Sequence, residues 1–198
     1  MRSPSILAFA GSTRKESLNK LLIDEAIGLM TTTTGARVTK VDLADFPLPL
    51  YDGDLEADQG LPENAKILKS HMIAHDGFLI AAPEYNGAIT AVLKNAIDWV
   101  SRPQPDEPSL VAYRGKTAAL LAASPGVIGG LRGLTIMRMI LTNLGMVVIP
   151  EQQTIPRANG AFDASGRLKE SADRDAVRIV TDRLVQVTTQ LFNSKSEP

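Results

Sequence analysis

The sequence predicts an α/β fold in which five parallel strands form one sheet, in the order 2-1-3-4-5, with helices on both faces. Short apolar runs, typical of strands buried on both faces, alternate with segments in which apolar residues recur at helical spacing. Such alternation is typical of strand–helix–strand units and a parallel sheet. The length of 198 residues suits one domain of this kind, so we expect residues 1–198 to form a single domain.

The first half of the chain supplies two strands and two helices. An apolar run over residues 6–10 predicts the first strand, and helical spacing follows over residues 17–30. Residues 37–43 alternate apolar and polar side chains, which predicts a half-exposed edge strand. The second helix is predicted over residues 62–74, with Pro62 in its first turn.

The middle of the chain repeats this alternation. The apolar run at residues 78–82 predicts a third, buried strand, and residues 90–100 predict the helix that follows it. Residues 116–123 predict the fourth strand, with a short helix as the alternative. The Gly115-Lys116 pair before this segment and the Ser-Pro-Gly sequence after it favour the strand.

The last part of the chain completes the sheet. A helix is predicted over residues 131–144 and the fifth strand over residues 146–149. A final helix carries one apolar stripe formed by Ala176, Val180, Leu184, Val187 and Leu191. Three segments are predicted to be loops, namely residues 47–61, 102–109 and 150–167.

Composition argues against several classes of protein. The formal net charge is −1 and no Lys/Arg cluster occurs, so we expect no nucleic-acid partner. The chain has no cysteine, which excludes disulfides and thiolate chemistry and fits a cytoplasmic location. The N-terminal apolar run of about five residues is too short for a signal peptide. No run reaches the roughly eighteen apolar residues of a membrane span.

The first motif lies between the first strand and the first helix, and reads Gly-Ser-Thr-Arg-Lys-Glu-Ser-Leu-Asn over residues 11–19. The unpaired N–H groups and positive dipole end of a helix N-terminus favour an anion. Arg14 adds a guanidinium suited to phosphate oxygens. The alternative is that Ser17 only caps the helix and Arg14 is solvated. The candidate phosphate-binding residues are Ser12, Thr13, Arg14, Lys15, Glu16, Ser17, Leu18 and Asn19.

The second motif lies where the third strand gives way to a helix. In an open α/β sheet the carboxyl ends of the strands face the ligand crevice, so this turn lies where ligands bind. It combines an aromatic face with hydrogen-bonding side chains, which suits a flat ring with polar edges. The alternative is an ordinary strand-to-helix turn. The candidate residues are Pro83, Glu84, Tyr85, Asn86 and Gly87.

The third motif, Ser-Pro-Gly-Val-Ile-Gly-Gly over residues 124–130, follows the fourth strand. Its glycines allow the backbone to approach a flat ligand closely. Glycines occur in many loops, so this motif alone is a weak signal. It gains weight because all three motifs follow strands and therefore lie at the same edge of the sheet. The candidate residues are Ser124, Pro125 and Gly126.

Together the three motifs resemble those of the NADPH-dependent FMN reductase family, which includes chromate, quinone and some azo reductases. Residues 11–19 match the family's phosphate loop, Gly-Ser-x-Arg-x-x-Ser-x-Asn, at every fixed position. Residues 83–87 are similar to its flavin-ring loop. Residues 124–130 are similar to the segment that borders the flavin, and Ser124 is the matched contact.

The resemblance implies a flavodoxin-like fold, one FMN per subunit, and an NADPH- or NADH-dependent oxidoreductase. Hydride would pass from the nicotinamide to flavin N5 and then to a small acceptor, such as a quinone, chromate, an azo compound or free flavin. The flavin carries this chemistry, so no side chain is assigned as catalytic. The resemblance also implies a homodimer or homotetramer. The helix at residues 90–100 has surplus apolar residues, so we expect Trp99 at or beside the interface.

Three other interpretations of these residues are disfavoured. A non-catalytic, flavodoxin-type electron carrier would bind FMN and serve protein partners, but such carriers tend to be strongly acidic because charge steers docking. His71 and His75 have the spacing of a zinc pair, but no third ligand is evident. Asp76, Asp42 and Asp45 suggest a phosphoacceptor, but they lie on the wrong strand or at the wrong strand end.

Overall fold

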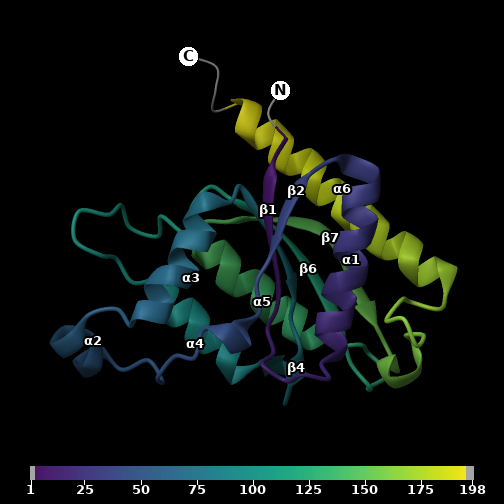
Figure 1. Ribbon diagram of the computed structural model, residues 1–198, viewed down its shortest axis with the longest axis horizontal. Helices are drawn as coiled ribbons and strands as arrows, with labels where there is room; N and C mark the ends of the chain where they lie inside the picture. The colour runs from purple at the N-terminus through teal and green to yellow at the C-terminus, as the bar shows by residue number, and fades with distance from the viewer. Residues whose placement is uncertain (1–2, 195–198) are drawn as a thin grey trace.

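The computed structural model describes residues 3–194, with side chains described as far as residue 192. Within this range, five parallel strands form a sheet in the order β2-β1-β3-β6-β7, which is the predicted order 2-1-3-4-5 (Figure 1). The predicted α/β fold is confirmed. The strands are β1 (Ser5–Ala10), β2 (Arg37–Lys40), β3 (Gly77–Ala81), β6 (Thr117–Ala123) and β7 (Val147–Ile155).

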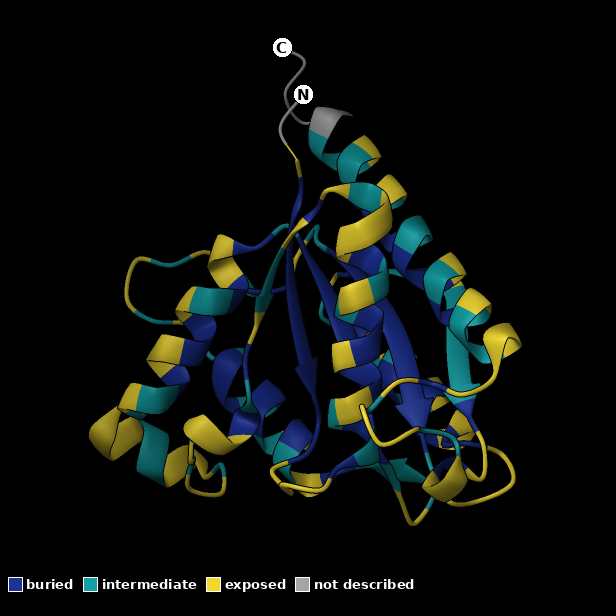
Figure 2. Cartoon of the chain, turned by 45° about the vertical axis from the view of Figure 1, so that its right-hand side comes forward, coloured by how far each residue is buried: buried dark blue, intermediate teal, exposed yellow. Residues whose placement is uncertain are grey.

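Helices cover both faces of the sheet. One face packs against α1 (Leu18–Thr34) and α6 (Ser171–Ser194). The other packs against α3 (Glu63–Ala74), α4 (Ala91–Val100) and α5 (Leu131–Asn143). Strands β1, β3 and β6 are buried along their whole length, as their continuous apolar runs predict (Figure 2). No helix among residues 3–194 is both long and apolar enough to cross a membrane.

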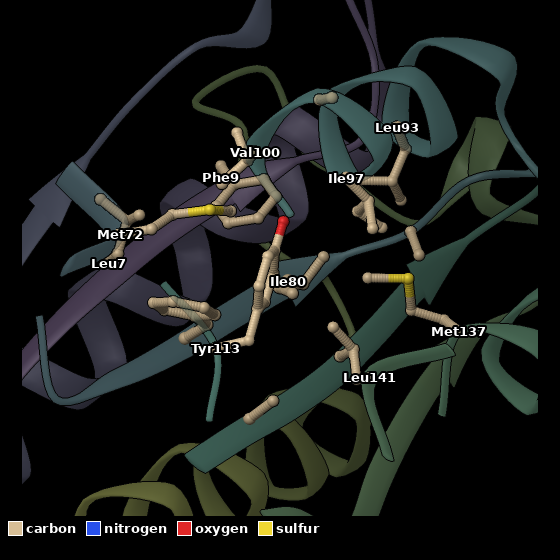
Figure 3. Packing of buried hydrophobic residues seen from close by; sticks show 14 of the residues in the cluster. Leu7, Phe9, Met72, Ile80, Leu93, Ile97, Val100, Tyr113, Met137 and Leu141 are labelled. Carbon is tan, nitrogen blue, oxygen red and sulfur yellow. The ribbon is translucent and has the colours of Figure 1, made fainter. Parts of the chain in front are cut away.

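The core on the α3–α5 side contains a polar group without a partner. Tyr113 is fully buried, and its ring lies edge-on to Phe78 at a centroid distance of 6.3 Å. Figure 3 shows its hydroxyl among the apolar side chains of this cluster, near Phe9 and Val100. Among the described residues the hydroxyl has no hydrogen-bond partner. Burial raises the pKa of Tyr113, because the charged form would lose its hydration.

Several predicted boundaries hold and others move, among them that of the fifth strand, which was predicted to end at residue 149 and ends at Ile155. Residues 116–123 form a strand rather than a short helix. The second strand ends at Lys40, short of the predicted residue 43, because Asp42 starts the 3₁₀ helix η1 (Leu43–Asp45). Its carboxylate accepts a hydrogen bond from the Ala44 N–H at 3.0 Å. Helix α1 continues to Thr34, four residues beyond the predicted end at residue 30.

Two of the predicted loops contain regular structure. Residues 47–61 contain α2 (Gly53–Gln59), which has no buried residue and so no apolar stripe by which to detect it. Residues 150–167 contain the second half of β7 and the 3₁₀ helix η2 (Ala158–Gly160). Strand β7 is a half-exposed edge strand with a bulge, where two positions on β6 span four on β7. The polar Glu-Gln-Gln sequence in its second half gives no apolar alternation from which a strand could be predicted.

Candidate functional site

The three motifs meet at the carboxyl edge of the sheet, around a cavity of about 220 Å³. Eleven of the sixteen predicted residues line it, whereas Thr13, Lys15, Asn86, Gly87 and Gly126 do not. Ala123 and Asn159 complete the lining. The lining residues of the three motifs are Ser12, Arg14, Glu16, Ser17, Leu18 and Asn19, then Pro83, Glu84 and Tyr85, then Ser124 and Pro125.

The phosphate loop leaves donors free at the start of α1. Ser17 occupies the N-cap position with an extended backbone, but its hydroxyl makes no capping hydrogen bond. Ser17 therefore takes the N-cap position without using its hydroxyl as the cap. The N–H groups of Leu18 and Asn19 lie in the first turn, where helix geometry gives them no partner. Arg14 is exposed and joins none of the ion pairs among the described residues.

Asn19 has a structural role that its position in the motif does not reveal. Its Nδ2 donates to the Ala123 carbonyl at 2.8 Å, and its Oδ1 accepts from the Ala123 N–H at 2.9 Å. Asn19 is 3% exposed, so both bonds are protected from water. This pair of bonds fastens the first turn of α1 to the end of β6, and so holds the first motif against the third.

Thr90 is a positioning residue that sequence reasoning missed. It caps α4, accepting from the Leu93 N–H at 3.3 Å, and its hydroxyl donates to the Gly11 carbonyl at 2.6 Å. One buried side chain thus links the phosphate loop to the helix that follows the second motif. The signal was present, because a Thr before an apolar helical run is a typical N-cap.

The second motif forms a β-hairpin, not a simple turn into the helix as predicted. Strands β4 (Glu84–Tyr85) and β5 (Ala88–Ile89) pair antiparallel. Between them Asn86 and Gly87 have φ angles of 53° and 79°. Two consecutive left-handed residues in a two-residue loop define a type I′ turn, for which Asn-Gly is a preferred sequence. The hairpin accounts for the Asn-Gly pair on structural grounds, while its backbone remains at the edge of the crevice.

Glu84 turns its carboxylate away from the hairpin and toward α5. The carboxylate accepts from Arg132 Nε at 2.7 Å and from the N–H groups of Arg132 and Gly133 at 3.1 and 3.2 Å. Burial alone would raise the pKa of Glu84, but these donors outweigh it and hold the pKa below its ordinary value. The carboxylate therefore fastens the hairpin to the N-terminus of α5, and Glu84 faces the cavity with its remaining atoms.

The third motif packs closely against the end of β7. The Ser124 N–H donates to the Ile155 carbonyl at 3.1 Å, and the Ser124 hydroxyl accepts from the Gly126 N–H at 3.2 Å. A Cβ on Gly129 would lie 2.9–3.0 Å from atoms of residues 154–156, so only glycine fits there. The glycines of this motif thus serve contact with β7 as well as access to the crevice.

Trp99 does not supply the exposed apolar surface predicted for it. The side chain is fully buried within the subunit, and its Nε1 donates to the Pro49 carbonyl at 2.8 Å. Tyr51 packs edge-on against it at a centroid distance of 5.0 Å. The segment after η1 therefore covers this part of α4. The surface argument for an interface at Trp99 is wrong.

The other polar clusters have structural partners. Both ring nitrogens of His75 are engaged, with the His71 carbonyl at 2.6 Å and the Thr39 hydroxyl at 2.8 Å. Asp76 accepts from the N–H and hydroxyl of Ser5, at the amino end of β1. A larger cavity, of about 550 Å³, lies along α1. It shares no lining residue with the cavity formed by the three motifs, and its three threonine hydroxyls are bonded to the helix backbone.

The donor set of the crevice fits a phosphate-bearing ligand. A helix N-terminus with free N–H groups, two buried serines and an unpaired arginine are the groups that bind phosphate. Whole ligand sites typically occupy about 300–1,000 Å³, so the 220 Å³ cavity accounts for one end of a nucleotide. The adjoining hairpin offers backbone groups for the other end.

Sequence comparison agrees with this geometry. The family model described as NADPH-dependent FMN reductase matches residues 4–160. The chain belongs to this family. It is 37% identical over 175 residues to an NAD(P)H-dependent FMN reductase of Pseudomonas aeruginosa, covering 87% of this chain and 89% of that protein. It is 33% identical over 181 residues to a quinone reductase of Pseudomonas putida, covering 90% and 91% respectively.

A solved structure shows the same architecture. FerB, a flavoenzyme NAD(P)H:(acceptor) oxidoreductase from Paracoccus denitrificans, superimposes with a TM-score of 0.74 at 28% identity. The superposition covers 94% of this chain and 98% of FerB. The flavodoxin-like fold and the family membership expected from the three motifs are both confirmed.

Proposed function

We propose that this protein is an FMN-dependent NAD(P)H oxidoreductase that passes hydride from NADPH or NADH through the flavin to a small acceptor. The acceptor class includes quinones, chromate, azo compounds and free flavin. We further propose that residues 1–198 act as one flavin-binding domain in a cytoplasmic homodimer or homotetramer. The observation that carries the proposal is the shared cavity, because residues from all three predicted loops line it.

The residues of the chain divide the task of holding the cofactor. Free N–H groups at the start of α1 and the guanidinium of Arg14 would hold the phosphate, aided by the hydroxyls of Ser12 and Ser17. The backbone of the β4–β5 hairpin would meet the ring. Bound FMN supplies the hydride-transfer chemistry. Glu84 and Thr90 would keep the hairpin and phosphate loop in fixed relative positions, because each fastens two elements of the site.

The electron-carrier alternative receives less support. A carrier that docks on protein partners gains from a strong charge of one sign, whereas the net charge here is −1. The relatives named above are reductases. Adding NADPH alone to the flavin-loaded protein separates the two functions, since only a reductase bleaches its flavin without a partner protein. Comparing NADPH with NADH across a quinone, chromate and azo-dye panel would then define the donor and acceptor.

The phosphate assignment is tested by Arg14→Ala. Loss of a charge-assisted hydrogen bond of about 1.5–3 kcal/mol lowers FMN affinity roughly ten- to a hundred-fold. Riboflavin lacks the phosphate, so its affinity should be low in the wild type and nearly unchanged in the variant. Lys66→Ala, on α3, removes the same charge at a residue that does not line the cavity, and serves as control. Equal binding of FMN and riboflavin by the wild type contradicts the assignment.

A further inference from the structure

The cavity has a fourth wall, formed by the segment that follows β7. This segment, residues 156–160, contains the short helix η2 and lies within the loop that the sequence predicts over residues 150–167. Asn159 from this segment lines the same cavity as Ser12, Arg14 and Ser17. Asn159 is exposed, and none of the hydrogen bonds among the described residues involves its side-chain amide. Its Nδ2 donors are therefore available to a ligand in the cavity.

Backbone contacts fix this wall against the third motif. The Arg157 N–H donates to the Gly126 carbonyl at 3.1 Å, and the Ala158 N–H donates to the Ser124 carbonyl at 3.0 Å. Ala158 is fully buried, which anchors the short η2 helix in the core. A segment held by buried packing and paired backbone groups presents the next side chain in a defined position.

The backbone just before Asn159 is in an unusual conformation. Arg157 has a φ of 47°, in the left-handed region that residues other than glycine rarely adopt. Such a conformation costs about 1 kcal/mol or more and is concentrated at functional sites, where the surrounding structure holds it. The two backbone hydrogen bonds to the third motif and the burial of Ala158 stabilise this conformation.

The layers of the fold show which end of the cofactor this wall faces. Ala158 packs in the core cluster formed with α1, on the α1–α6 face of the sheet. The phosphate loop opens α1 on this same face. The β4–β5 hairpin instead packs on α5, on the opposite face, where a Cβ on Gly133 would lie 3.3 Å from Glu84 Cβ. Asn159 therefore lies on the phosphate side of the crevice.

We infer that Asn159 is a further cofactor-binding residue, whose amide donates to a phosphate oxygen of the flavin mononucleotide. This inference rests on the proposed function, because it assumes that the cavity holds the phosphate end of FMN. It extends the binding site to a fourth strand end. The amide would complement the charged donors across the cavity, because it faces the anion from the β7 side while Arg14 and the α1 N-terminus face it from the β1 side.

The test measures flavin affinity by fluorescence titration in Asn159→Ala and Asn159→Asp, with FMN and riboflavin as probes. The alanine variant loses one donor to an anion, so its FMN affinity should fall about five- to tenfold. The aspartate variant places a like charge beside the phosphate, so its FMN affinity should fall further. Riboflavin affinity should change by less than about twofold in both, since riboflavin has no phosphate to lose.

The control is Asn143→Asp, which makes the same change of charge at an exposed position. Asn143 ends α5, and α5 runs back from the carboxyl edge of the sheet, so this residue lies at the opposite edge. Its FMN affinity should equal that of the wild type. Circular dichroism confirms the fold of each variant, and Asn159→Ser replaces Asn159→Asp if the aspartate variant does not fold.

The outcomes separate this inference from the proposed function. Wild-type protein that prefers FMN to riboflavin, with Asn159 variants that bind FMN normally, overturns the role of Asn159 alone. Equal losses for FMN and riboflavin also overturn it, because they indicate a general disturbance of the crevice. Wild-type protein that binds neither flavin overturns the proposed function and this inference together.

Discussion

Ser17 and Asn19 are two residues apart in the phosphate loop, yet the structure predicts different effects on stability when each is replaced by alanine. Asn19→Ala removes both hydrogen bonds to Ala123, so it should lower the free energy of unfolding. Ser17→Ala removes a hydroxyl that makes no capping bond, so it should leave the stability of the cofactor-free protein unchanged. FMN affinity should fall in the Ser17 variant, whose hydroxyl is free to bind phosphate.

The size of the Asn19 effect follows from its contacts. Each lost bond removes about 1 kcal/mol of net stability, and a buried group left without a partner costs about 1–3 kcal/mol. Asn19 and Ala123 line the cavity, so in the variant water can enter the space left by the side chain, reach the Ala123 backbone and offset some of this cost. We therefore expect a loss of about 2–4 kcal/mol. Replacing an ordinary capping serine by alanine lowers the free energy of unfolding by about 0.5–2 kcal/mol. For Ser17→Ala we expect a decrease of less than about 0.5 kcal/mol.

Urea unfolding of the flavin-free proteins, followed by circular dichroism, measures both free energies. Flavin titration of the folded variants measures FMN affinity separately. The interpretation is refuted if Asn19→Ala is as stable as the wild type, because its bonds to Ala123 would then contribute nothing. A Ser17→Ala variant destabilised by more than about 1 kcal/mol would show that the hydroxyl caps α1 after all.

Three further variants test other parts of the structure. Gly87→Val should reduce flavin occupancy, whereas Gly87→Asn should not, because asparagine tolerates the φ of 79° and valine does not. Equal flavin affinity of the two variants in titrations would argue against the hairpin turn. Tyr113→Phe should raise the free energy of unfolding by about 1 kcal/mol, because it removes a buried hydroxyl that has no hydrogen-bond partner among the described residues. A lower free energy of unfolding in urea would show that the hydroxyl does have a partner. The pKa of Glu84 is held below its reference value of 4.5, so its bonds stabilise the fold at neutral pH and this contribution is lost as pH falls below about 4.5. Glu84→Gln should flatten that dependence in urea unfolding measured from about pH 7 down to about pH 2.5, and an unchanged slope would contradict it.

The sequence predicts the topology well because burial and hydrophobic pattern coincide in the central strands. Strands β1, β3 and β6 are continuous apolar runs, and each is buried on both faces. Their carboxyl ends must share one edge of a parallel sheet, so the convergence of the three motifs follows from the topology. The position of the cavity lined by all three motifs could therefore be predicted from the strand order alone.

Elements held by polar contacts were not predictable in the same way. Helix α2 has no buried residue, and β7 is a half-buried edge strand with a bulge. The bulge leaves carbonyls at residues 148 and 149 that Arg138 satisfies through its guanidinium, at 3.1 and 2.8 Å. Such partners are distant in sequence and follow no period. For the same reason the roles of Asn19 and Glu84 as fasteners emerged only from their contacts.

One exposed apolar surface that could complete the site lies at the crevice. Trp99 is covered by the segment containing Pro49 and Tyr51, so α4 offers no aromatic side chain to a second subunit. Large apolar side chains are instead exposed at the carboxyl edge of the sheet, on the β4–β5 hairpin, the third motif and the start of α5. They are Tyr85, Val127, Ile128 and Leu131, exposed by 51%, 68%, 42% and 45%. These side chains surround the position proposed for the flavin ring, where a flat apolar acceptor or a second subunit would remove them from water. We therefore expect the proposed oligomer to form through these four side chains. Light scattering across a dilution series, with activity measured on the same samples, tests whether the active protein requires a second subunit.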